Sequence, residues 1–221
     1  MELSPPLPCP SASRRSASTN LPLIQATSFP HFRHFIRANG DGVELEYVKQ
    51  LVPEHPEKAV FQALARTNGK TSTVVVKFTP KYCHAAHEIA QAKNFAPVLW
   101  FYEEVHTVGM FVVVMDFIEG ESLGEDSALS EELVRELREV LGALHGHNLV
   151  YGDLRPPNVI ISDHGPMLVD FDWAGEEGTA RYPADINMGV LWHRDVKPCG
   201  LIHRDHDIHM LDCWKRGGSD S

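Results

Sequence analysis

Residues 150–172, VYGDLRPPNVIISDHGPMLVDFD, place polar side chains at fixed spacings within a mostly apolar run. Two apolar segments, 159–161 and 167–169, flank the chain-breaking residues 164–166, and this pattern predicts a β-hairpin. Asp153 and Asn158 then lie on the loop that enters the hairpin, and Asp170 lies at its exit. Two carboxylates and an amide oxygen around one point are the groups that phosphoryl transfer uses as base and as Mg²⁺ ligands.

The octapeptide at 151–158, YGDLRPPN, resembles the catalytic loop of the protein kinase superfamily, and the triplet at 170–172, DFD, resembles its metal-binding triplet. The resemblance implies that Asp153 and Arg155 are catalytic and that Asn158 and Asp170 bind Mg²⁺. Tyr-Gly replaces the usual His-Arg, and Asp172 replaces the usual glycine. These departures are most similar to the short kinase-like proteins of fungi, and they also fit atypical kinases and small-molecule phosphotransferases.

Two other interpretations compete with this assignment of the catalytic loop. A hairpin whose Asp and Asn residues only cap turns would have the same composition. The segments around Asp195 and Asp205, both HRD, look closer to a kinase catalytic loop than YGD does. However, Gly200 and Met210 stand five residues after them, where an amide ligand would be needed, so Asp153 is the better candidate.

Composition limits the classes of protein. The 221 residues suffice for one globular unit with a substantial core. The formal net charge of -10 argues against nucleic acid or an anionic membrane as partner. The four cysteines show no paired spacing, and no apolar run is long enough to span a membrane. We expect an intracellular protein, cytoplasmic or nuclear, that is a monomer.

Composition also divides the chain. Residues 1–28 are rich in Ser and Pro and are expected to be a disordered tail. Residues 29–42, where aromatic and basic residues alternate, are expected to be a linker or a short helix. A kinase-like domain should follow at 43–212, with an N-lobe at 43–117 and a C-lobe at 118–212. Residues 213–221 are expected to be a disordered tail.

Five segments predict the strands of an antiparallel sheet in the N-lobe. They are 43–52, 59–66, 73–79, 98–104 and 110–116, with Asn68-Gly69 as a tight turn between the second and the third. The spacing of apolar residues predicts a helix at 82–94. By resemblance, Lys77 pairs with the α- and β-phosphates of ATP, and Glu88 orients Lys77 through an ion pair. An exposed strand lysine and a helix-surface glutamate are the simpler alternatives.

Two connections bear on nucleotide binding. Asp116, Phe117 and Ile118 correspond by resemblance to the inter-lobe hinge whose backbone binds adenine. The link at 53–58, PEHPEK, has no glycine, although kinases carry a glycine-rich loop there. Two prolines remove N–H donors and two glutamates repel phosphate, so this link weakens the case for ordinary catalysis.

The C-lobe is predicted to be mostly helical and shorter than in ordinary kinases. Ser130 can cap a helix that ends near Gly146 and carries a stripe of leucines and valines. By resemblance, Asp207 starts a second helix and braces the catalytic loop. The fold class is therefore α+β, a bilobal protein-kinase-like fold with a five-stranded antiparallel N-lobe and a truncated C-lobe.

Retention of Lys77, Glu88, Asp153, Asn158 and Asp170 in the right order favours an ATP-dependent phosphotransferase that uses Mg²⁺. The resemblance implies transfer of the γ-phosphate to a hydroxyl of an unknown protein or small-molecule acceptor, with protein Ser/Thr as the first expectation. A non-catalytic pseudokinase that acts as an interaction module is the alternative, and a small-molecule kinase of the aminoglycoside or choline type is the second.

Overall fold

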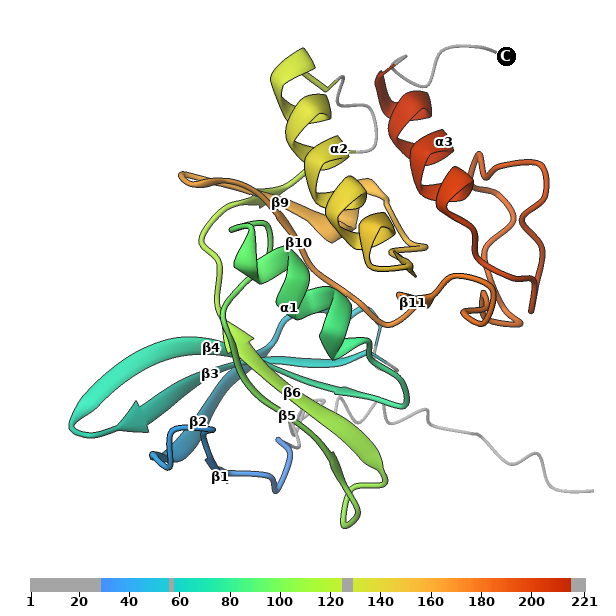
Figure 1. Ribbon diagram of the computed structural model, residues 1–221. Helices are drawn as coiled ribbons and strands as arrows, with labels where there is room; N and C mark the ends of the chain where they lie inside the picture. The colour runs from blue at the N-terminus through green and yellow to red at the C-terminus, as the bar shows by residue number, and fades with distance from the viewer. Residues whose placement is uncertain (1–28, 56–57, 125–128, 216–221) are drawn as a thin grey trace, which may run out of the picture. The chain divides into compact units, whose positions relative to one another are not determined.

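A six-stranded antiparallel sheet, in the order β1-β2-β3-β4-β6-β5, forms the N-lobe (Figure 1). The computed structural model describes residues 29–55, 58–124 and 129–215, so the tail predicted at 1–28 lies outside the described residues. The strands are β1 (His34–Ile36), β2 (Gly42–Gln50), β3 (Ala59–Thr67), β4 (Lys70–Thr79), β5 (Leu99–Val105) and β6 (Met110–Asp116). Five of them match the predicted segments to within about three residues at each end.

Strand β1 corrects the prediction for 29–42 and adds a sixth strand to the predicted five. Phe35 is buried between exposed His34 and Ile36, an alternation with the period of a strand. Phe35 pairs with Val43 of β2, and its ring centroid lies 4.9 Å from that of Phe101. The short helix is wrong because packing of this aromatic ring against the sheet requires an extended backbone.

The turn between β3 and β4 is the predicted Asn68-Gly69 turn. Thr67 pairs with Lys70, and the two residues between them have φ values of 49° and 73°. Positive φ at both positions defines the tight hairpin turn that Asn-Gly favours. The pairing it fixes sets Val60 opposite Lys77, so Lys77 lies on β4 between two neighbouring strands.

Helix α1 (His84–Ala92) is shorter than the predicted 82–94 and contacts both β5 and helix α2 (Glu131–Gly146). It lies between the sheet and α2 (Figure 1). Its buried residues are Ala86, His87 and Ala90. These positions fix the rotation of the helix, which decides which of its side chains can reach the sheet.

The C-lobe begins after β6. Its elements are β7 (Glu121–Ser122), α2, β8 (Leu149–Val150), the 3₁₀ turn η1 (Pro156–Asn158), β9 (Val159–Ser162), β10 (Gly165–Leu168), β11 (Gly175–Glu176) and α3 (Arg204–Lys215). The predicted hairpin is confirmed, since β9 and β10 pair antiparallel from Val159↔Leu168 to Ser162↔Gly165. Helix α3 runs to Lys215, so the disordered tail predicted from residue 213 is wrong for its first three residues, and 216–221 lie outside the described residues.

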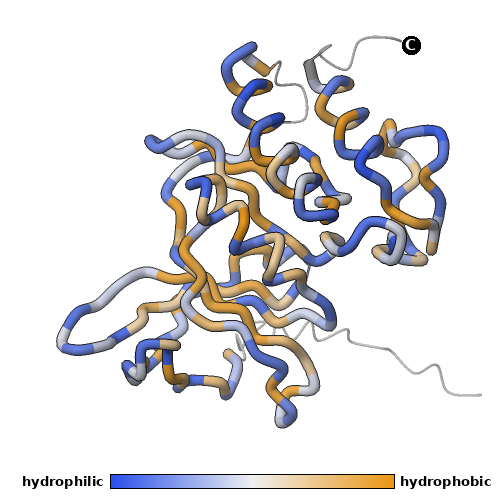
Figure 2. Tube along the Cα trace, viewed as in Figure 1, coloured by the Kyte–Doolittle hydropathy of each residue, from blue (hydrophilic) through white to orange (hydrophobic). Residues whose placement is uncertain are grey.

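Helix α2 is the scaffold of the C-lobe. Ser130 caps it as predicted, because its Oγ accepts a hydrogen bond from Leu133 N at 3.1 Å. Its inner face carries the buried residues Val134, Leu137, Val140, Leu141 and Leu144. The colouring of Figure 2 shows this apolar stripe facing the rest of the lobe, with polar residues on the opposite face. Such a stripe is expected for a helix with one side in the core.

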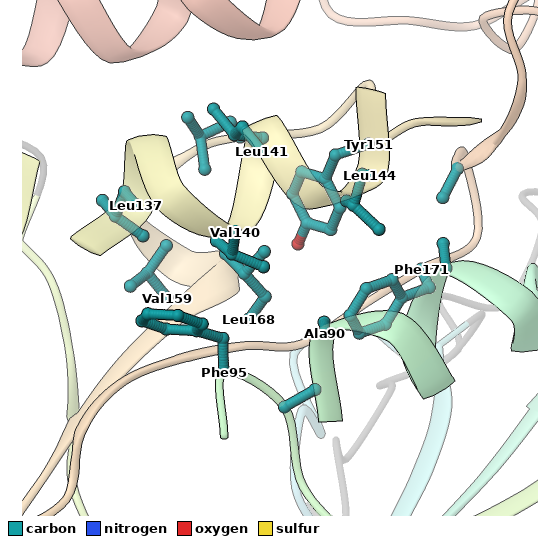
Figure 3. Packing of buried hydrophobic residues seen from close by; sticks show 14 of the residues in the cluster. Ala90, Phe95, Leu137, Val140, Leu141, Leu144, Tyr151, Val159, Leu168 and Phe171 are labelled. Atoms are coloured by element: carbon teal, nitrogen blue, oxygen red, sulfur yellow. The ribbon is translucent and has the colours of Figure 1, made fainter. Parts of the chain in front are cut away.

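One apolar core joins the two lobes. Phe95 and Ala90, from the N-lobe side, pack with the α2 stripe, Tyr151, Val159, Leu168 and Phe171 (Figure 3). A backbone hydrogen bond also joins the two lobes, since Leu168 N donates to Phe95 O at 2.7 Å. The strand ends that carry the polar residues are therefore held against the N-lobe sheet by this core.

Candidate active site

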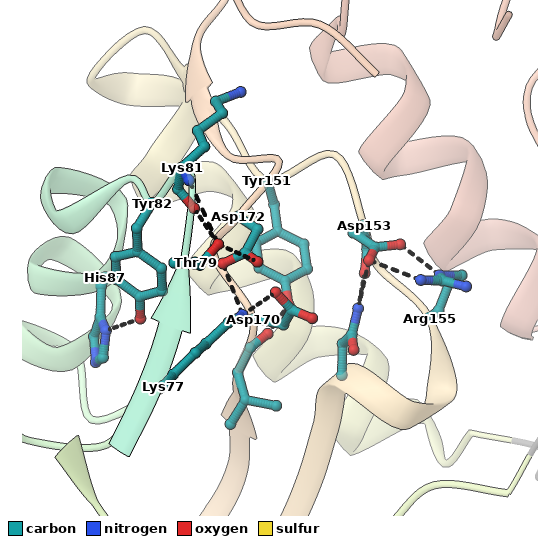
Figure 4. Close-up of polar contacts among 12 residues, drawn as sticks. Lys77, Thr79, Lys81, Tyr82, His87, Tyr151, Asp153, Arg155, Asp170 and Asp172 are labelled. Atoms are coloured by element: carbon teal, nitrogen blue, oxygen red, sulfur yellow. Dashed lines mark hydrogen bonds and ion pairs between the residues drawn. The ribbon is translucent and has the colours of Figure 1, made fainter. Parts of the chain in front are cut away.

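The loop after β8 holds Asp153 by its neighbours. Asp153 is only 3% exposed. Its Oδ1 accepts from Arg155 Nε at 2.5 Å, and its Oδ2 accepts from Arg155 Nη2 and Asn158 Nδ2, each at 2.8 Å (Figure 4). Asn158 Nδ2 also donates to Asp153 O at 2.9 Å. Because a carboxylate offers about four lone-pair sites, Asp153 can still accept one further proton donor.

The hairpin brings Asn158 and Asp170 together, as predicted. Val169 N donates to Asn158 O at 3.0 Å, which extends the β9–β10 pairing by one step beyond Val159 and Leu168. Asp170 follows at once, with a φ of 65° that turns the chain away from the hairpin. Positive φ is uncommon for a residue other than glycine, although Asp and Asn adopt it more readily than most.

Lys77 crosses from the N-lobe to meet the DFD triplet. It is 8% exposed on β4, so the alternative of an exposed strand lysine is wrong. Its Nζ lies 2.6 Å from Asp170 Oδ1 and 2.7 Å from Asp172 Oδ1 (Figure 4). Lys77 donates a hydrogen bond to Asp170, whereas Asp172 Oδ1 is buried and makes an ion pair without a hydrogen bond.

The charges of this triad shift one another's pKa values. Burial acts to lower the pKa of Lys77, but the two carboxylates outweigh it and raise that pKa. Burial acts to raise the pKa of Asp170, but Lys77 and, more weakly, Lys58 bring it below its ordinary value. Burial and the neighbouring Asp170 raise the pKa of Asp172 to about 6. Asp172 is therefore the carboxylate of the pair that takes up a proton first as the pH falls.

Glu88 does not pair with Lys77, so the predicted ion pair is wrong. Glu88 is exposed on α1, and the helix turns His87 inward in its place. One residue along a helix is a rotation of 100°, which is enough to reverse the assignment. His87 stacks on Phe171 at 4.8 Å between ring centroids. Its neighbour Tyr82 extends toward Lys77, whose Nζ is 5.8 Å from the Tyr82 ring centroid.

Asp207 braces the catalytic loop, as predicted. It is 1% exposed in the first turn of α3. Its Oδ2 accepts from Tyr151 N at 2.9 Å, and its Oδ1 accepts from Gly152 N at 2.7 Å. Gly152 has a φ of +81°, and a Cβ there would come within 2.9 Å of Ile202 Cδ1. The replacement of the usual arginine by glycine therefore has a steric reason in this chain.

Arg155 is held on two sides. Besides its bond to Asp153, its guanidinium lies 5.5 Å from the Trp173 ring centroid and 5.7 Å from that of Trp192. Contacts of a guanidinium with aromatic faces are attractive by about 0.5–2 kcal/mol. The two tryptophans were not predicted from the sequence, because nothing local marks residues 18 and 37 positions away as neighbours of a loop.

Two of the three predicted hinge residues use their backbone amides in hydrogen bonds within the fold. Phe117 N donates to Thr73 O at 3.2 Å, and Asp116 N donates to Val98 O at 3.0 Å. Asp116 Oδ1 also accepts from Trp100 Nε1 at 2.6 Å. These two amides are therefore engaged with β4 and with the start of β5, and Ile118 is the residue of the three whose amide remains for a ligand to use.

The two HRD segments do not belong to this constellation. Asp195 is exposed, with its carboxylate 3.6 Å from His193, and Asp205 is exposed on α3. In the described ranges, no three His, Cys, Asp or Glu side chains are arranged to hold a metal ion. A site shared by Asp170 and Asn158 would be of a different kind, because an amide oxygen is one of its ligands.

The fold and the site geometry define a protein of the protein-kinase-like superfamily. The family model described as lipopolysaccharide core biosynthesis protein (WaaY) matches residues 87–198, about half of the 221-residue chain. The chain therefore belongs to this family, whose match includes every predicted catalytic and metal-binding residue.

Individual relatives agree on the superfamily. Mouse serine/threonine-protein kinase 36 is 28% identical over 192 residues, which are 79% of this chain and 14% of that protein. The KEOPS complex subunit Bud32 of Pyrococcus abyssi is 27% identical over 143 residues, 62% of this chain and 64% of that protein. This chain thus spans only part of the length of either relative.

Solved structures support the fold. The Cydia pomonella granulovirus kinase PK-1 superposes with a TM-score of 0.60 at 15% identity, over 79% of this chain and 67% of that one. At this identity the likeness concerns the fold alone. Among the described helices, none is both long and apolar enough to cross a membrane.

Proposed function

We propose that this protein is an ATP-dependent phosphotransferase that moves the γ-phosphate of ATP onto a hydroxyl group. The observation that carries the proposal is the convergence of Lys77, Asp153, Asn158 and Asp170 from three separate segments of the chain. The Lys77–Asp170 ion pair at 2.6 Å joins the lobes, and the hydrogen bond from Val169 N to Asn158 O joins the catalytic loop to the triplet.

Asp153 accepts the proton of the acceptor hydroxyl in this proposal. Burial raises the pKa of its carboxyl, and the hydrogen bond and charge of Arg155 oppose that shift. A carboxylate with a raised pKa is a stronger proton acceptor near neutral pH. The bonds from Arg155 and Asn158 fix the carboxylate, so its reorganisation during proton transfer is small.

Two cations act on the phosphates. Lys77 binds the α- and β-phosphates, and Arg155, which lies beside Trp173 and Trp192, stabilises charge on the transferred group. The link between β2 and β3 lacks glycines, yet Lys58 at its end acts on Asp170 strongly enough to help lower its pKa. This lysine supplies positive charge on the side where kinases use backbone amides.

The residues present fit a magnesium ion. Mg²⁺ prefers oxygen ligands, and the candidates are the Asp170 carboxylate and the Asn158 amide oxygen. Asn158 Nδ2 donates its hydrogen bonds to Asp153, and Asn158 Oδ1 is therefore left as an acceptor on the other side of the amide. The ion would supply positive charge that neutralises the phosphates of ATP. Asp170 and Asn158 are therefore the metal ligands in this proposal.

Two classes of hydroxyl are candidates for the acceptor of the phosphate. The similarity to a serine/threonine-protein kinase favours a protein hydroxyl as acceptor. The family description instead favours a sugar hydroxyl of a lipopolysaccharide core. Transfer of ³²P from ATP to casein and to purified core oligosaccharide, run in parallel with an acceptor-free control, separates these two from ATP hydrolysis alone.

Asp170→Asn tests the metal role. The change should weaken Mg²⁺-dependent ATP binding by about tenfold or more while affecting metal-free binding much less, because a carboxylate ligand is lost and the adenine contacts remain. Calorimetric titrations with Mg²⁺ and with EDTA measure both. Equal weakening under both conditions would contradict the assignment of Asp170.

Failure of the wild-type protein to bind ATP or to transfer phosphate would also be informative. A protein that binds ATP in either titration but transfers no phosphate to any acceptor or to water would be a pseudokinase. A protein that binds no ATP at all would contradict the proposed function.

A further inference from the structure

Lys77 has a charged partner that the resemblance did not anticipate. In the kinase arrangement an acidic residue of the N-lobe helix orients the lysine. Here Glu88 is exposed on α1, and the second carboxylate on Lys77 is that of Asp172, at 2.7 Å. Asp172 stands where the metal-binding triplet usually has a glycine, so the change that weakens the triplet motif supplies the missing carboxylate.

The inner face of α1 offers no charge to Lys77. His87 is fully buried there. Its Nε2 lies 2.7 Å from Pro97 O, and its Nδ1 lies 2.6 Å from Tyr82 Oη. A carbonyl oxygen only accepts, so Nε2 carries the proton and Nδ1 accepts from the tyrosine. Both ring nitrogens are thus satisfied by a neutral imidazole.

Asp172 is itself fixed to the strand that carries Lys77. Its Oδ2 accepts from Thr79 Oγ1 at 2.9 Å. Thr79 follows Lys77 by two residues on β4, so both side chains project from the same face of the strand. Cys83 N, just before α1, donates to Phe171 O at 3.1 Å and holds the residue before Asp172. Four contacts therefore fasten the triplet to β4 and the start of α1.

We propose that Asp172 is the positioning residue for Lys77, in place of an acidic residue on α1. The inference rests on the proposed function, because its purpose is to aim Lys77 at the phosphates of ATP. An ammonium group has three donors, so Lys77 can keep its ion pair with Asp172 while its donors turn from Asp170 to the phosphates. The direction of Lys77 is then set by the DFD segment, and α1 does not control it.

A double-mutant cycle on the protein without nucleotide tests the pair. Lys77→Met leaves Asp170 and Asp172 facing each other, whereas the same change in an Asp172→Asn background removes that repulsion. We expect Lys77→Met to lower the melting temperature by several degrees more in the protein that keeps Asp172 than in the Asp172→Asn background. Additive changes in melting temperature would overturn the proposal.

A second double-mutant cycle tests whether the Lys77–Asp172 pair supports nucleotide binding. In EDTA, Asp172→Asn should weaken binding of the β,γ-imido analogue of ATP by about 5- to 50-fold, and it should have little further effect once Lys77 is replaced by methionine. Glu88→Gln is the matched control and should leave this affinity unchanged. Loss confined to the Mg²⁺ titration would make Asp172 a metal ligand instead and would overturn the proposal.

The two cycles separate the possible failures. A wild-type protein that binds no nucleotide would contradict the proposed function, and with it the purpose assigned to Asp172, while the melting temperatures would still decide whether Asp172 holds Lys77. A strong effect of Glu88→Gln on metal-free affinity would show that α1 positions Lys77 after all and would overturn the proposal.

Discussion

Asp153 and its two look-alikes differ in their surroundings. Asp153 is buried and hydrogen-bonded by Arg155 and Asn158, whereas Asp195 and Asp205 are exposed. If Asp153 takes the proton of the acceptor, Asp153→Asn should lower turnover by roughly 10²- to 10⁴-fold and change ATP affinity only slightly, because the loss falls on the transition state. Steady-state phosphate transfer and calorimetric ATP binding on the purified variant measure the two effects.

Asp195→Asn and Asp205→Asn serve as controls for Asp153→Asn. Both should keep turnover near the wild-type value, because neither carboxylate lies in the constellation. Inactivity of a well-folded Asp195→Asn protein, together with an active Asp153→Asn protein, would show that the catalytic loop has been assigned to the wrong segment.

His87 should make stability depend on pH. Burial lowers its pKa from 6.5 to about 4, so between these values the unfolded chain binds a proton that the folded chain does not. The contribution of His87 is complete above pH 6.5 and is lost as the pH falls toward 4, by about 3 kcal/mol at most. Urea unfolding of the wild type and of His87→Gln across this range measures the difference in slope.

The comparison of two proteins is needed because Asp172 acts in the opposite direction. Its pKa is raised to about 6, so the folded chain holds its proton more tightly and stability decreases as the pH rises toward 6. That contribution is common to both proteins and cancels. His84→Gln, on the exposed face of the same helix, should keep the wild-type slope; if His87→Gln also keeps it, His87 titrates alike in the folded and unfolded chains.

The sequence predicted the part of the site whose geometry is set by spacing along the chain. Asp153, Asn158 and Asp170 are linked by one loop and one hairpin, so their spacing nearly determines their arrangement. Lys77 was assigned by resemblance to the kinase family, at its place in the third predicted strand. Glu88 was misassigned because helix rotation depends on packing, and the Lys77–Asp172 pair was missed because it forms between residues of different lobes. Contacts of that kind leave no local pattern.

Helix α3 matters to the site through one side chain. Asp207 accepts both the Tyr151 and Gly152 amides, and its Oδ2 also lies 3.0 Å from His145 Nε2. Asp207→Asn leaves one oxygen for two amides, so one buried N–H loses its partner. We expect a loss of about 2–4 kcal/mol in unfolding free energy and a fall in turnover as the loop loosens.

Urea unfolding and phosphate-transfer assays measure the two effects of Asp207→Asn. Asp205→Asn, an exposed position in the same first turn of α3, is the matched control for the loss of charge at a helix start. A loss in Asp205→Asn as large as that in Asp207→Asn would attribute the effect to the helix dipole, and the brace would then be of little importance.

At the level of elements, prediction succeeded where turns are chemically marked. Asn68-Gly69 fixed the β3–β4 hairpin, and Ser130 fixed the start of α2. Strand β1 and the two-residue strands β7, β8 and β11 were not predicted. Each is too short for a periodic pattern, and each is defined by backbone pairing with another strand, β1 with β2, β7 with β9, and β8 with β11.

The two lobes share one apolar cluster. Tyr82, Ala86, Ala90, Phe95 and Met115 from the N-lobe pack in the same cluster as the α2 stripe, Phe171 and Leu211. The Lys77–Asp170 and Lys77–Asp172 ion pairs and the Thr79–Asp172 hydrogen bond add polar contacts across the same boundary. Separating the lobes would expose this apolar surface and leave buried charges unpaired, and both effects oppose it.

The protein should therefore unfold in one cooperative transition. Unfolding of either lobe would remove packing from the other, because Phe171 and Leu168 lie against the α1 and Phe95 surfaces. Differential scanning calorimetry should give a ratio of calorimetric to van't Hoff enthalpy near one. Lys77→Met should move this transition to lower temperature without splitting it. Two resolved transitions in the wild type would show that the N-lobe sheet and the C-lobe helices are independent folding units and that the shared core contributes little.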